Sequence, residues 1–158
     1  MYLLTYISSP KEMGEQVHFE FYIHDVMKSE PNFDTSKCFK NKFVYLFDCF
    51  LDFCPYEVYQ PREVADDGCI LSEAKKEKMF LEWKNLVKVN LACRAALIVL
   101  IKKYLVEGDF LEMYSINWGE GTPDILPEPQ HTMMLSIDEL QESRDFVLKD
   151  GHKFIIYR

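Results

Sequence analysis

A long helical pattern between Ser72 and Glu107 constrains the fold more than any other feature of this chain. Up to Lys88 the pattern is amphipathic, with an apolar face made of Met79, Phe80, Trp83, Leu86 and Val87. Beyond Asn90 it is apolar almost all round, as expected of a helix that is buried on several sides. Ser72 suits the N-cap, and Gly108 suits the C-terminal stop. The pattern predicts either one long helix or two helices that separate at Asn90.

Length and composition indicate one folded domain. The chain has 158 residues, of which 48% are hydrophobic, 15% aromatic and 28% charged. This hydrophobic content is too high for disorder, and no repeat period is present. We therefore expect a single α+β domain over residues 1–158.

The cellular compartment of the protein is predicted from the absence of a targeting signal and from the pattern of cysteines. The first residues carry no basic segment followed by a long apolar one, as a secretory signal would. The most apolar stretch, Leu91 to Ile101, is shorter than the roughly 20 residues that cross a bilayer as a helix. Five cysteines at irregular spacing do not form a disulfide framework. A cytoplasmic protein that does not enter a membrane is predicted.

An apolar and aromatic run that ends at Ser8-Ser9-Pro10 predicts a strand over residues 1–7, and alternation of apolar and polar residues predicts strands over residues 17–24 and 109–117. In the third of these, Glu112 alternates in phase with Phe110, Tyr114 and Ile116. The Asp150-Gly151 dipeptide, between two apolar runs, predicts a β-hairpin over residues 146–157.

Two further helices are expected, over residues 35–53 after a cap at Asp34 and over 136–144 from a capping box at Ser136. The aromatic density of the first segment also suits a strand. Strands at both ends and helices between them predict an α+β fold. Its antiparallel or mixed sheet would pack against a long central helix pair.

Motifs for catalysis or metal binding are weak. Cys49 and Cys54 have no second pair nearby to complete a zinc site, and we expect both to be buried in the core. The four histidines, His18, His24, His131 and His152, are expected on solvated surfaces. A Gly-x-Ser-x-Gly nucleophile motif is missing, and Gly119-Glu120-Gly121 lacks the lysine of a phosphate-binding loop. We expect no enzymatic activity, no metal and no cofactor.

Charge is distributed unevenly along the chain. The 26 Asp and Glu residues outnumber the 18 Lys and Arg residues, giving a net charge of −8. Such a charge disfavours nucleic-acid binding. Residues 109–135 contain no Lys or Arg; the acids there are Asp109, Glu112, Glu120, Asp124 and Glu128. Tyr114, Trp118 and Ile125 are interleaved with these acids, a mixture that suits recognition of a basic protein.

The whole-chain profile, the acidic loop from Trp118 to Glu128 and the closing segment from Phe146 to Tyr157 resemble bacterial immunity proteins. These are encoded beside polymorphic or contact-dependent growth-inhibition toxins. The resemblance implies a monomer or homodimer that inhibits the C-terminal domain of its cognate toxin, often a nuclease, by stoichiometric binding. Toxin-binding residues would be Glu112, Glu120, Asp124 and Glu128 for charge, with Trp118 as the aromatic anchor. The alternative is a self-associating regulatory or adaptor protein without catalytic activity.

Overall fold

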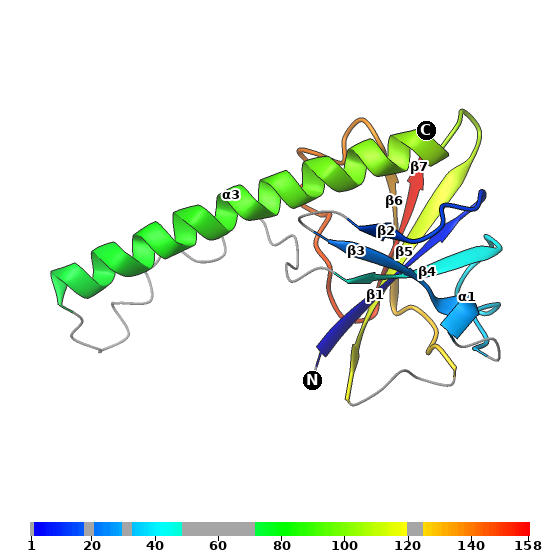
Figure 1. Cartoon of the computed structure of the whole chain (residues 1–158), viewed down its shortest axis with the longest axis horizontal. Coiled ribbons are helices and arrows are strands. Elements are labelled where there is room, and N and C mark those ends of the chain that lie inside the picture. The colour runs from blue at the N-terminus through cyan, green and yellow to red at the C-terminus, as the bar shows by residue number, and fades with distance from the viewer. Residues whose placement is uncertain (1, 18–20, 30–32, 49–71, 120–124) are drawn as a thin grey trace.

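A seven-stranded mixed sheet forms the body of the molecule (Figure 1). The computed structural model describes residues 2–17, 21–29, 33–48, 72–119 and 125–158. The elements in chain order are β1 (Tyr2–Ser9), β2 (Gln16–Val17), β3 (Tyr22–Asp25), α1 (Val26–Ser29), β4 (Phe43–Asp48), α3 (Glu73–Tyr104), β5 (Phe110–Trp118), β6 (His131–Ser136) and β7 (His152–Tyr157).

The strand order is β2-β3-β4-β1-β5-β7-β6, so the first strand of the chain lies at the centre of the sheet. Neighbouring strands are antiparallel except β6 and β7, which are parallel. The α+β class and the strands predicted over residues 1–7 and 109–117 are confirmed by β1 and β5.

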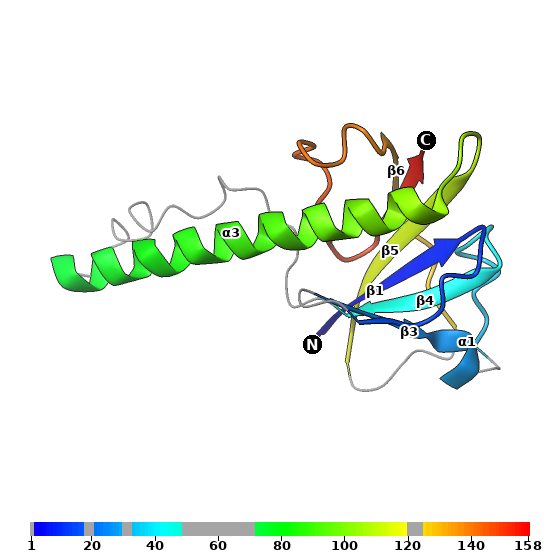
Figure 2. The same ribbon diagram turned by 45° about the horizontal axis from the view of Figure 1, so that its top comes forward.

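The predicted helix pair is a single long helix. α3 has 32 residues and continues through Asn90 without a break. Its buried residues all lie between Cys93 and Ile101, and its first half extends beyond the sheet (Figures 1 and 2). The prediction of a helix pair was therefore wrong. The apolar second half of α3 packs against the sheet instead of against a second long helix.

Both faces of the sheet are covered by apolar side chains. The face under α3 forms the larger core, where Leu97 and Ile101 of the helix meet Ile7, Met113 and Phe154 of the sheet. The opposite face forms a second core with the segments around residues 33–39 and 126; its buried members are Tyr6, Val26, Phe33, Cys38, Phe39, Val44, Tyr114, Ile116 and Leu126. Side chains on both faces of a central strand are consequently buried.

The helix predicted over residues 35–53 was wrong where the structure describes that segment. Residues 36–38 form a turn, and β4 follows, pairing with β1 on one side and β3 on the other. Tyr45 and Phe47 face α3, while Val44 faces the second core. The aromatic residues that suggested a helix stripe are thus shared between two covered faces, as in an interior strand.

The strand predicted over residues 17–24 is instead two strands that fold back on each other. Gln16 of β2 pairs with Ile23 of β3, and Val17 pairs with Tyr22. β3 pairs with β4 on its inner side and with the short β2 on its outer side, so the segment adds two strands to this edge of the sheet.

The C-terminal region also departs from prediction. Residues 137–142 form turns instead of a helix, and Arg94 donates hydrogen bonds to the carbonyl oxygens of Ser143 at 2.9 Å and Phe146 at 2.7 Å. The segment makes turn bonds of its own, among them one from the Ser143 amide to the carbonyl oxygen of Glu139 at 2.9 Å, and the buried guanidinium supplies donors to carbonyl oxygens towards its end. The Asp150-Gly151 turn is present, with Gly151 at φ 72°, but β7 pairs with β5 and β6, and residues 146–148 form no strand.

Candidate functional site

A buried ion pair lies on the sheet face opposite α3. Oε1 of Glu112, on β5, is 2.7 Å from Nζ of Lys153, on β7. The strand register places Glu112 opposite Ile155 and Tyr114 opposite Lys153, so the two charged side chains are diagonal neighbours on one face. Glu112 is fully buried and Lys153 is 8% exposed. A charge pair so placed requires further hydrogen bonds to offset its desolvation.

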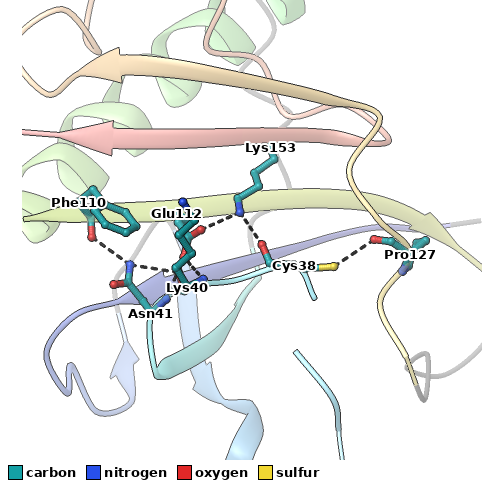
Figure 3. Close-up of polar contacts among 8 residues, drawn as sticks. Cys38, Lys40, Asn41, Phe110, Glu112, Pro127 and Lys153 are labelled. Atoms are coloured by element: carbon teal, nitrogen blue, oxygen red, sulfur yellow. Dashed lines mark hydrogen bonds and ion pairs between the residues drawn. The ribbon is translucent and has the colours of Figure 1, made fainter. Parts of the chain in front are cut away.

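The second carboxylate oxygen of Glu112 supplies those bonds (Figure 3). It accepts hydrogen bonds from the Ser8 hydroxyl at 2.8 Å and from the backbone amides of Lys40 at 2.9 Å and Asn41 at 3.1 Å. Lys153 in turn donates to the carbonyl oxygen of Cys38. The ion pair therefore fastens residues 38–41 onto the sheet.

The same region holds the loop that follows residue 124. The Tyr114 hydroxyl donates to the carbonyl oxygen of Pro127 at 2.9 Å. The Cys38 thiol lies 3.2 Å from that same oxygen, a contact drawn in Figure 3. Burial raises the pKa of Tyr114 to about 12 and also raises the pKa of Cys38. Both groups keep their protons at neutral pH and remain donors to the loop.

An acidic and apolar surface lies on this support; we call it the Ile125 surface and define it as Asp34, Ile125, Pro127 and Glu128. All four residues are exposed, and Ile125 retains 57% of its accessible surface. A β-bridge joins Asp34 to Ile125. Hydrogen bonds from the amide and hydroxyl of Ser36 lower the pKa of Asp34, so its carboxylate stays ionised.

The expected toxin-binding residues are placed differently from one another. Glu112 is in the interior with both oxygens engaged, which removes it from any contact surface. Glu128 is exposed, so its carboxylate is accessible at the surface. Trp118 ends β5, but its side chain lies outside the described residues, as do Glu120 and Asp124.

Two residues of this region were missed in the sequence. Asp34 was assigned to a helix cap, although the helix does not form. Lys153 was assigned to the second strand of the expected hairpin without a partner, although it precedes the apolar run Phe154-Ile155-Ile156. One acid and one base, each within an apolar strand, are the signal that would have suggested a buried pair.

Comparisons with known proteins give no assignment. A scan against protein-family models and searches of curated proteins and of solved structures found no match. Across the described ranges, His, Cys, Asp and Glu do not gather in groups of three or more that could hold a metal ion. In that same part of the chain, the helices are too short or too polar to cross a membrane. Cys49, Cys54 and His18 lie outside the described residues, and His24 is exposed on β3.

Proposed function

We propose that this chain is a protein inhibitor that binds a basic partner domain through the Ile125 surface, in the manner of immunity proteins that neutralise a cognate toxin. The observation that carries the proposal is the exposed Ile125, which is bridged to Asp34 and lies three residues before Glu128, on a hydrogen-bonded support. An exposed apolar residue supplies contact area, and flanking acids accelerate encounter with a cationic protein.

Preorganisation supports this choice of surface. Binding by a flexible loop requires the loop to be ordered at the moment of contact, which weakens affinity. Here Pro127 is tied to Tyr114 and Cys38, and the segment under Asp34 is tied to Glu112 and Lys153. The net charge of −8 acts in the same direction, since it attracts a basic domain at long range.

The test is co-purification with the product of the adjacent upstream gene, with the two proteins expressed together and washed at low and moderate salt. A one-to-one complex with the C-terminal domain of that product is expected. Ile125→Ser and Glu128→Lys should weaken the complex. Glu107→Lys, an equal charge change in the exposed turn after α3, should leave it intact. Equal binding by all three variants would remove the Ile125 surface from the proposal. Failure of the wild-type protein to bind the upstream gene product would remove the inhibitor function.

A second candidate is a self-associating adaptor protein. The first half of α3 extends beyond the sheet and leaves Leu81, Leu86 and Val89 at 60%, 52% and 49% exposure (Figure 2). Contact between copies through this helix would bury those side chains. Sedimentation at several concentrations distinguishes the two candidates: a mass that rises with concentration, and falls back in Leu86→Glu, favours the adaptor.

A further inference from the structure

Two histidines far apart in sequence lie side by side at one edge of the sheet. His131 begins β6 and His152 begins β7, and the parallel register places them directly opposite each other. Their ring centroids are 5.0 Å apart, with an angle of 54° between the ring planes. His131 is exposed and His152 is half-buried. The rings share an open hollow of about 360 Å³ whose other lining residues are Gln130, Thr132, Met133 and Lys153.

The backbone under both rings is fixed. The carbonyl oxygen of Gly151 accepts hydrogen bonds from the amides of Gln130 at 2.9 Å and His131 at 3.1 Å. The amide of Gly151 donates to Ser115 on β5, and the amide of His152 closes the turn at Lys149. The two Cα positions cannot separate without breaking the start of both strands.

The charges around the pair are mixed. Burial lowers the pKa of His152, with smaller contributions in the same direction from His131 and Lys149, while Asp150 opposes them. Lys153 also lines the hollow, but its ammonium is directed to Glu112 on the other face of the sheet.

We propose that His131 and His152 together bind one divalent transition-metal ion, each through one imidazole nitrogen, with water in the remaining positions. A metal about 2.1 Å from one nitrogen of each ring, at a near-tetrahedral angle, places the ring centroids about 5 Å apart. The observed separation meets that requirement. Imidazole ligands suit Zn²⁺, Ni²⁺ and Cu²⁺, and Cu²⁺ binds most tightly among these. This site is independent of the Ile125 surface and of the proposed inhibitor function.

The experiment is calorimetric titration of tag-free protein with Zn²⁺, Ni²⁺ and Cu²⁺ at pH 7.5. One site per chain is expected, with Cu²⁺ the tightest. His131→Ala and His152→Gln should each weaken that site by about tenfold or more, because one of two protein ligands is lost. His24→Ala is the matched control, because His24 is exposed on β3 and lies against Tyr22 instead of a second histidine.

Electron paramagnetic resonance of the Cu²⁺ complex adds a readout that does not depend on affinity. Coupling to two imidazole nitrogens is expected in the wild type and to one in each site variant. Circular dichroism verifies that the variants are folded. The proposal is overturned by unchanged titrations in both site variants, by equal weakening in His24→Ala, by a single coupled nitrogen in the wild type, or by failure of all three ions to bind.

Discussion

Oε1 of Glu112 lies 2.7 Å from Nζ of Lys153, inside the protein and on the sheet face opposite α3. The pair joins β5 to β7, and its remaining hydrogen bonds hold residues 38–41 against the same face. The chain therefore uses one acid from its most acidic segment as an internal anchor and leaves Glu128 of the same segment at the surface. The stability of the Ile125 surface depends on this internal pair.

Replacing Glu112 by Gln should reduce the free energy of unfolding by about 3–5 kcal/mol, because the ammonium of Lys153 then remains buried without its counter-charge. Urea unfolding followed by circular dichroism measures the loss. The double variant with Lys153→Met should be more stable than Glu112→Gln alone, since it carries no uncompensated cation.

The matched control is the exposed ion pair of α3, in which Lys78 and Glu82 are 3.8 Å apart and 76% and 65% exposed. Glu82→Gln should change the free energy of unfolding by less than about 0.5 kcal/mol. An equally small effect of Glu112→Gln would contradict the assignment of Glu112 as an internal anchor.

Arg94 should not tolerate replacement by Lys. The residue is 7% exposed, and its guanidinium donates to several carbonyl oxygens between residues 140 and 146, which one ammonium cannot reach together. Arg94→Lys should reduce the free energy of unfolding by about 2–4 kcal/mol, since buried carbonyls lose their donors. Hydrogen exchange should show faster exchange over residues 137–148. Arg158→Lys, which alters one bond to Leu105 at the chain end, serves as the control and should have little effect.

The sequence predicted those elements whose local pattern agrees with their surroundings. β1 follows its apolar and aromatic run, β5 follows its alternation, and α3 follows its helical periodicity. The two wrongly predicted helices, over residues 35–53 and 136–144, have a common cause. In each segment, residues far away in sequence supplied hydrogen bonds or covered the apolar side chains. Arg94 binds carbonyl oxygens of the turns found where a helix was expected after Ser136, and two covered faces made a strand of the aromatic segment ending at Asp48.

The candidate sites were harder to predict than the fold. The alternation already placed Glu112 in phase with Tyr114 and Ile116, which indicates burial, but the base that makes burial possible is 41 residues away in sequence. The pairing of His131 with His152 required the parallel register of β6 and β7. The segment that connects β6 to β7 is irregular and has no periodic pattern. The sequence separation of the two histidines therefore does not predict that they are paired.

Cys38 should be unreactive in the folded protein. It is 2% exposed, its thiol lies 3.2 Å from the carbonyl oxygen of Pro127, and burial raises its pKa, so little reactive thiolate forms at pH 8. Iodoacetamide should label it slowly in buffer and rapidly in urea, as measured by peptide mass mapping. Cys93, which is fully buried on the face of α3 that packs against the sheet, should behave in the same way. Equal labelling of Cys38 in buffer and in urea would show that residues 33–41 do not cover this face in solution.

The Tyr114 hydroxyl should make stability depend on alkaline pH. Its pKa is about 12 in the folded chain and about 10 in an unfolded one. Between these values the unfolded state has lost the proton while the folded state keeps it, so stability falls as the pH rises from 10 towards 12.

Tyr114→Phe should lower the free energy of unfolding by about 0.5–1.5 kcal/mol at pH 8, through loss of the bond to Pro127, and should reduce the further fall above pH 10. Urea unfolding at pH 8, 10 and 11 measures both effects. Tyr157→Phe is the control, because Tyr157 is 41% exposed, and it should retain the wild-type alkaline fall. An alkaline fall in Tyr114→Phe as steep as in the wild type would assign the titration to another group, of which Tyr45, whose pKa burial also raises, is the first to replace.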